Sequence, residues 1–285
     1  MKKLDLKYQL DDAIYRAFNL WSAARFHFET SIRGMLARNH DLKDRHKSQR
    51  CFIVGNGPSI LQQPLEKLSG ETVFACNYFY KHEKVTTIRP AYYFILDGKI
   101  KTGEWPVSML DEVAASCPDS QLFLEAALDH KPDTYVFTKK FPVYWIGTGQ
   151  IIYPGFDYPI DLTRRIGGDN VVKIALQTAI YMGFTEIYLL GIDGDGLFRD
   201  LIGQSSHFYE AAAENAEMDY LRMEKDLWFC TEGFRSWRAI AERFQFGPVR
   251  VYNATHGGLL NIFPRRTLEE ALSTKSKVEQ AASLS

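Results

Sequence analysis

The pattern of hydrophobic and polar positions divides the chain into two parts. Residues 39–50 are polar and show no apolar period. In residues 1–40, apolar side chains recur at steps of three, four and seven, which is typical of an amphipathic helix; they are Leu10, Ile14, Phe18, Trp21, Phe28, Ile32 and Leu36. The pattern therefore predicts an amphipathic helical extension with its linker over residues 1–48.

From residue 51 onward, short apolar runs alternate with helical periods. The runs predict strands over residues 51–55, 72–77, 92–97, 121–124, 186–193 and 249–253. The periods predict helices over residues 59–68, 105–116, 170–182, 210–227 and 232–245. Such alternation favours an open, mostly parallel α/β sheet with helices on both faces. We therefore predict a Rossmann-like domain over residues 49–272, with its ligand at the carboxyl ends of the strands.

Two segments interrupt this alternation. Residues 129–168 are rich in Pro, Tyr, Gly and Lys and fit no helical period, and we predict that they form a lid over the cleft. Residues 194–209 would be a second part of that lid. Residues 273–285 are small and polar and are predicted to be a flexible tail.

Charge adds a feature that the pattern does not show. The chain has 34 Lys and Arg against 35 Asp and Glu, a formal net charge of -1, which argues against a nucleic-acid binder. Residues 1–50 nevertheless carry a net +5, so the remainder carries -6. The basic extension therefore either lies on an anionic membrane surface, packs on the main domain, or forms the interface of a homo-oligomer.

Cysteine usage and the first residues bear on location. The four cysteines are widely spaced and suggest neither a zinc site nor a disulfide framework. No run of about 18 apolar residues occurs, and Met-Lys-Lys-Leu-Asp lacks the apolar core of a signal peptide. We expect a cytoplasmic protein, or one held peripherally on the inner face of the membrane.

The sharpest local motif is Gly55-Asn56-Gly57-Pro58-Ser59, directly after the first predicted strand. A glycine-rich turn that opens a helix presents backbone N–H groups to an anion. The motif lacks the spacing and the lysine of a Walker loop, and position 60 is Ile rather than the last glycine of GxGxxG. The motif therefore predicts contact with the phosphate or ribose of a nucleotide, with an ordinary strand–helix turn as the alternative.

Polar residues also follow the next strands. Asn77 and Asp97 end the second and third predicted strands, where a side chain points into the cleft. Asp193 and Asp195 lie in Asp-Gly-Asp-Gly at the end of the fifth, and could offer carboxylates to a divalent cation. A capping Asn and a solvated turn are the alternative interpretations.

Two histidines lie at the same edge of the predicted sheet. His207, in Ser205-Ser206-His207-Phe208-Tyr209, lies on the cleft side, and a neutral histidine is a good general base near pH 7. His256 follows the last predicted strand and is the second candidate. The alternative for each is a surface or capping residue.

Several of these runs resemble the bacterial sialyltransferases of glycosyltransferase family 42. They are Phe52-Ile-Val-Gly-Asn-Gly-Pro-Ser59, Phe74-x-Cys-Asn77-x-Phe79-Tyr80, Gly183-x2-Glu186-Ile-Tyr-Leu-x-Gly191-Ile-Asp193 and Ser206-His207-Phe208. The resemblance implies metal-free, inverting transfer of an acidic sugar from a CMP-activated donor to a glycan of the cell surface. It also implies that His207 is the base and that Asn56, Asn77 and Asn170 contact the donor.

The chain departs from that family where tyrosines would hold the leaving phosphate. The corresponding stretch, residues 194–200, has no Tyr. The replacements would be Arg199, Tyr209, or the lid residues Arg164 and Arg165. Extra Asp residues there would repel a phosphate unless a metal intervenes. The donor could then be another nucleotide-sugar.

The glycine-rich turn and the helix–strand core also resemble the 6-hydroxymethylpterin diphosphokinase-like family. That resemblance implies pyrophosphoryl transfer from Mg-ATP, with Asp97, Asp193 and Asp195 as metal ligands. A third interpretation is a non-catalytic nucleotide-binding scaffold docked by its first helix.

Overall fold

The computed structural model describes residues 2–128, 134, 137–139, 141–157, 159–209, 220–244 and 247–273. Within them the chain forms one eight-stranded sheet in the order β6-β5-β4-β3-β2-β1-β7-β8, and every neighbouring pair is parallel. The strands are β1 Arg50–Val54, β2 Val73–Cys76, β3 Tyr92–Ile95, β4 Gln121–Glu125, β5 Val143–Gln150, β6 Arg165–Gly167, β7 Glu186–Leu190 and β8 Arg250–Asn253. The predicted parallel α/β class is confirmed.

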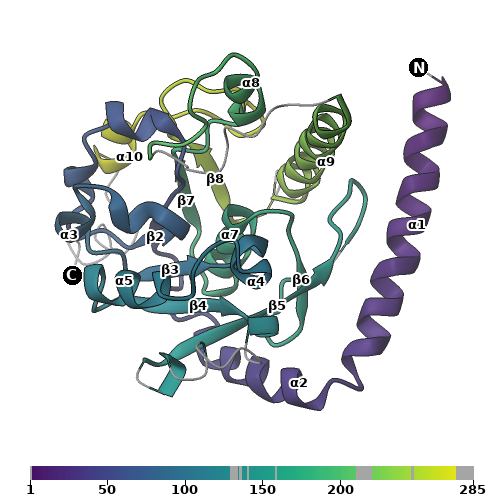
Figure 1. Ribbon diagram of the computed structural model, residues 1–285, viewed down its shortest axis with the longest axis horizontal. Helices are drawn as coiled ribbons and strands as arrows, with labels where there is room; N and C mark the ends of the chain where they lie inside the picture. Colours follow the sequence, from purple (N-terminus) through teal and green to yellow (C-terminus); the bar gives the residue numbers. More distant parts are fainter. Residues whose placement is uncertain are drawn as a thin grey trace.

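Helices flank both faces of this sheet (Figure 1). They are α1 Lys2–Phe26, α2 Thr30–Ala37, α3 Val85–Ile88, α4 Gly98–Thr102, α5 Met109–Ser116, α7 Val171–Tyr181, α8 Gly196–Leu201, α9 Tyr220–Phe244 and α10 Leu268–Ser273. Side chains of β1 alternate between the two faces, as strand geometry requires. Phe52 and Val54 join the core under α3, α5 and α10, whereas Cys51 and Ile53 join the core under α7 and α9.

The order of the strands reverses between β1 and β7. The chain runs outward from β1 through β6 and then returns to place β7 against the other side of β1, with Val54 paired to Leu190. Open α/β sheets bind ligands at the carboxyl ends of the strands, at the point where the order reverses. In this chain that point brings the loop after β1 next to the loop after β7.

One predicted helix is wrong, and two others are confirmed over their described residues but are continuous with each other. Residues 59–68 form two short 3-10 helices, Pro58–Gln62 and Leu65–Leu68, rather than one α-helix, because Gln63 before Pro64 is extended and breaks the helix. The predicted helices 210–227 and 232–245 become one helix, α9, over their described part. Residues 210–219 lie outside the described residues.

The predicted lid is also partly wrong. Residues 143–150 and 165–167 are β5 and β6, two strands of the sheet. Val143-Tyr-Trp-Ile146 suits a strand, but Gly147 and Gly149 interrupt its pattern, and the pairing with β6 shifts register between Thr148 and Gln150. Residues 129–133, 135–136, 140 and 158 of the predicted lid, and residues 274–285 of the predicted tail, lie outside the described residues.

The first fifty residues form two α-helices rather than one. The break lies at residues 27–29 between α1 and α2. Residues 39–49, predicted as a linker, are anchored on the sheet instead, since Leu42 is fully buried. The fully buried Asn39 side chain donates to the carbonyls of Trp145 and Leu162, both at 2.7 Å. Among the described residues, no helix is long and apolar enough to cross a membrane.

Candidate functional site

A cavity of about 530 Å³ opens at the carboxyl ends of β1, β2, β3 and β7. Ten of the residues predicted for the site line it: Gly55, Asn56, Gly57, Asn77, Asp97, Asn170, Asp193, Asp195, His207 and Tyr209. Four do not line it: Ser59, Arg165, Arg199 and His256. Arg164, also predicted to hold the leaving phosphate, lies in a separate hollow near α2. The sheet therefore brings residues that are as far apart in sequence as Gly55 and Tyr209 into one place.

The glycine-rich turn packs closely against the end of β7. The N–H of Gly55 donates to the carbonyl of Leu190 at 2.8 Å, and the N–H of Gly57 donates to that of Gly191 at 2.9 Å. A Cβ on Gly57 would lie 2.6 Å from Cγ of Asp193. These amides bind β7 and are not presented to an anion, and the helix after them is a 3-10 helix of five residues. The glycines are explained by close packing rather than by an anion-binding turn.

Asp193 is the side chain against which the turn packs. It is buried, and one carboxylate oxygen accepts the N–H of Ser59 at 3.1 Å while the other accepts the Ser59 hydroxyl. Burial raises the pKa of Asp193, and the hydrogen bonds from Ser59 oppose that rise. Ser59, predicted to touch the ligand, thus acts behind the cavity wall by fixing Asp193.

Three buried oxygen atoms of the cavity wall have no hydrogen-bond partner among the described residues. They are the side-chain Oδ1 atoms of Asn56, Asn77 and Asp195. Asn77 holds its position with a left-handed backbone (φ 48°), a conformation that Asn tolerates better than most residues. Buried acceptors are normally satisfied, so these atoms suit a ligand that brings hydroxyl or amino donors, or a cation.

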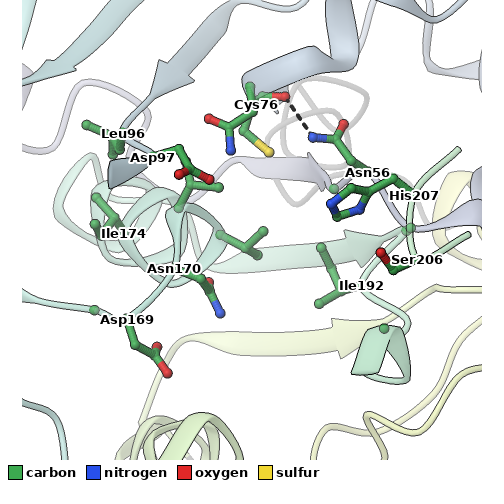
Figure 2. Close-up of a pocket in the computed structure, with 18 of the residues that line it drawn as sticks. Asn56, Cys76, Leu96, Asp97, Asp169, Asn170, Ile174, Ile192, Ser206 and His207 are labelled. Carbon is green, nitrogen blue, oxygen red and sulfur yellow. Dashed lines mark hydrogen bonds between the residues drawn. The ribbon is translucent and has the colours of Figure 1, made fainter. Parts of the chain in front are cut away.

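His207 is held next to Asn56. The N–H of Phe208 donates to the carbonyl of Asn56 at 2.9 Å, and the His207 ring stacks on Tyr209 with centroids 5.0 Å apart. Figure 2 shows the imidazole beside Asn56, across the opening from Asp97. A general base must lie within reach of the proton that it takes, and His207 lines the cavity in which such a proton would have to lie.

Asp97 and Asn170 act as helix caps in addition to lining the cavity. The Asp97 carboxylate accepts the N–H of Lys99 at 2.9 Å, and the Asn170 amide oxygen accepts the N–H of Lys173 at 3.0 Å. Each cap satisfies a backbone donor at the start of a helix. Each cap uses only one oxygen of its side chain.

The predicted residues outside the cavity have other partners. Arg165 binds Glu29 and donates to the carbonyl of Thr148 at 2.6 Å. Arg199 pairs with Asp195 at 2.9 Å. His256 is exposed and lines a separate hollow together with Arg265 and Arg266. Thus none of these three supplies positive charge directly to the cavity.

Two lysines that the sequence analysis missed supply positive charge to the cavity. Lys99 and Lys101, on α4, line the cavity, and Lys101 pairs with Glu125. Their position directly after Asp97, at the end of the third strand, could have predicted that they line the cavity. Among the described residues, the lining nonetheless carries five carboxylate residues against two lysines; the acids are Asp97, Glu125, Asp169, Asp193 and Asp195. A bare polyphosphate would be repelled unless a cation accompanied it.

A second cavity of about 470 Å³ adjoins the first. The two share Asp169, Asn170 and Trp237, and the second is walled by apolar side chains of α8 and α9, including Leu197, Phe229 and Phe234. Lys173 at its base is fully buried, and its ammonium group binds Asp169, Ser236 and the Gly233 carbonyl. The second cavity thus combines charged groups with an aromatic wall.

Carboxylates do not gather into a preformed metal cage. Among the described residues, no group of three or more His, Cys, Asp or Glu side chains could hold a metal ion. Mg²⁺ is usually held by one or two carboxylates plus substrate phosphates. The unpartnered Oδ1 of Asp195 is the oxygen that fits such a role.

Comparison with known proteins identifies the family. The family model for MptE-like 6-hydroxymethylpterin diphosphokinases matches residues 30–195, more than half of the chain. The chain therefore belongs to the MptE-like family. This agrees with the diphosphokinase resemblance and not with the resemblance to sialyltransferases. A search of curated proteins finds no match.

Proposed function

We propose that this member of the MptE-like family transfers a diphosphoryl group from a nucleoside triphosphate to the hydroxyl of a pterin-like acceptor. The observation that carries the proposal is the acid-rich cavity with the unpartnered oxygen of Asp195. An excess of carboxylates opposes a bare nucleotide and favours one that arrives with a divalent cation. The family's name supports the same reaction.

The nucleotide would lie at the turn after β1. Asn56 and Asn77 direct unpartnered oxygens into the cavity and would accept hydrogen bonds from ribose hydroxyls or a base amino group. Lys99 and Lys101 would contact the phosphates from α4. A divalent cation supplies charge neutralisation at the phosphates when bound, and Asp195 would hold it through Oδ1.

The acceptor would enter from the adjoining cavity. A flat ring would pack against Trp237 and Phe229 there. Its hydroxyl oxygen attacks the β-phosphorus, the bond between that phosphorus and the oxygen bridging to the α-phosphorus breaks, and the nucleoside monophosphate leaves. His207 takes the proton of the hydroxyl as the new oxygen–phosphorus bond forms.

The products test this proposal. The full chain is incubated with Mg-ATP and a 6-hydroxymethylpterin, and phosphorus NMR with mass spectrometry follows the nucleotide and the acceptor. We expect AMP and diphosphorylated acceptor in equal amounts, and none with EDTA. His207→Gln should lower turnover by about 100-fold or more, whereas His256→Gln, outside the cavity, should leave it unchanged. Formation of ADP, or full turnover by His207→Gln, would overturn the proposal.

A second candidate is glycosyl transfer from a CMP-activated acidic sugar. The position of Ser206 and His207 in the cavity wall favours it, because a base there can also serve attack of a glycan hydroxyl on an anomeric carbon. The same assay with CMP-sialic acid in EDTA decides between the two. Release of CMP would favour this candidate, and absence of turnover with both donors would favour a nucleotide-binding scaffold.

A further inference from the structure

The side of α1 that faces the body of the protein is polar. The buried Asn19 side chain exchanges two hydrogen bonds with the backbone of Ile151, at 2.9 and 2.8 Å. The Tyr15 hydroxyl donates to Glu232 of α9 at 3.1 Å, and Asp12 pairs with Arg235 of the same helix. Hydrogen bonds and ion pairs thus hold the middle of α1 to the body, and Phe26 at its end is buried in the core.

The opposite side of α1 is apolar and exposed. Four of its side chains form a row that we call the outer stripe: Leu6, Leu10, Ile14 and Trp21. Their exposed fractions are 57%, 58%, 64% and 55%. These residues are spaced by four, four and seven, so they share one face of the helix. Asn19 is nine residues beyond Leu10, about half a turn away around a helix of about 3.6 residues per turn. The outer stripe therefore faces away from the body, and Figure 1 shows α1 at the outer edge of the molecule.

This arrangement reverses the usual orientation of a surface helix, whose apolar stripe faces the core. Exposed aromatic side chains extend it, with Phe18 at 39% and Phe28 at 85%. An exposed apolar stripe along a helix marks a site of interaction. The charges near this stripe indicate what kind of partner binds there.

A basic hollow lies at the end of α1, in the bend toward α2. Its lining includes His27, Arg33 and Arg164 together with the hydroxyls of Thr30 and Thr163, and within the described part of the chain no carboxylate lines it. The Arg25 guanidinium lies 5.5 Å from the Trp21 ring, beside the outer stripe. Residues 2–37, which hold α1 and α2, carry six basic against four acidic side chains, a net +2. An anionic partner complements this face, whereas a second copy would bring two basic segments together.

We propose that α1 lies on the surface of an anionic lipid bilayer. The outer stripe inserts Leu10, Ile14 and Trp21 at the boundary between headgroups and acyl chains, and the basic hollow binds a lipid phosphate through Arg33 and Arg164. Apolar burial and attraction to anionic lipid together hold amphipathic helices in this position. This docking does not depend on which group the cavity transfers.

Vesicle flotation with the full chain tests the proposal. One set of vesicles is pure phosphatidylcholine, and the other contains phosphatidylglycerol at about one lipid in three. We expect strong binding to the second set, weakening as salt is raised, and at least about tenfold weaker binding to the first. Equal binding to both sets, or binding to neither, would overturn the proposal.

Matched variants distinguish binding through the outer stripe and the basic hollow from nonspecific effects of changing a surface residue. Leu10→Asp with Ile14→Asp should abolish binding without changing the melting temperature, whereas Leu61→Asp, at an exposed leucine outside α1, should leave binding intact. Arg164→Gln should weaken binding about fivefold, and Arg238→Gln on α9 should not. If light scattering instead shows a dimer that the double variant dissociates, a second copy covers the stripe and the proposal fails.

Discussion

The carboxylate of Asp193 accepts the backbone N–H of Ser59 at 3.1 Å, across 134 positions of sequence. This contact joins the turn after β1 to the end of β7, at the point where the strand order reverses. The Ser59 hydroxyl adds a second bond to the same carboxylate. The wall of the cavity depends on this pair.

Ser59→Ala should lower the free energy of unfolding by about 1–3 kcal/mol, because it leaves a buried carboxylate oxygen without its donor. Chemical denaturation measures the change. Ser108→Ala removes an exposed hydroxyl that caps no helix, and should change the free energy by less than about 0.5 kcal/mol. Equal effects of the two substitutions would contradict the account.

The titration of Asp193 predicts a pH dependence of stability. Burial raises the pKa of this carboxyl above its ordinary value of 3.8, so the folded state holds the proton more tightly than the unfolded state. The contribution of Asp193 to the free energy of unfolding is therefore greatest below the unfolded-state pKa. It falls as pH rises to the folded-state pKa and is constant above it.

Asp193→Asn isolates this contribution, because Asn does not titrate. The free energy of unfolding of the wild type minus that of the variant should fall as pH rises through this window. Urea denaturation from about pH 4 to about pH 8 measures it. A difference that rises with pH would show instead that the carboxylate is stabilised in its charged form.

Gly57→Ala tests the close packing of the turn. The added Cβ would lie 2.6 Å from Cγ of Asp193 and 2.7 Å from the Gly191 carbonyl oxygen, so the turn must shift. We expect a loss of about 1–3 kcal/mol, measured by chemical denaturation. Gly98 also lines the cavity but has open space around it, and Gly98→Ala should preserve stability.

Asn39→Ala tests the anchoring of residues 39–49. The substitution leaves the carbonyls of Trp145 and Leu162 without their donor in a buried place, and should cost about 2–4 kcal/mol of unfolding free energy. His40→Ala, at the neighbouring exposed position, should have almost no effect. A loss no larger than that of His40→Ala would restore the interpretation of this segment as a linker.

The sequence was most informative where periodicity is long and unbroken. The helix predicted over residues 170–182 is observed as α7, capped by Asn170, and β1 and β7 follow their apolar runs. Side-chain periods could not reveal β5, since two glycines interrupt it, nor the buried role of Asn39, whose partners lie more than 100 positions away.

The site was predictable in its location more than in its contacts. Ligands of open α/β sheets bind at the carboxyl ends of the strands, and this rule correctly predicted that Asn56, Asn77 and His207 line one cavity. It could not show that the amides of Gly55 and Gly57 are used by β7, because that depends on which strands become neighbours. Lys99 and Lys101 were missed because lysines after a strand usually belong to solvated turns.

The most direct test of the nucleotide site is calorimetric titration of Mg-ATP into Asn77→Gly. Glycine accepts the left-handed backbone at this position, so the fold should persist while one unpartnered oxygen is lost from the cavity. We expect one nucleotide per wild-type chain and about fivefold weaker affinity in the variant. Arg89→Gly, at a left-handed position that does not line the cavity, is the control and should bind as the wild type does. Unchanged affinity in Asn77→Gly, or no binding by the wild type, would contradict the account.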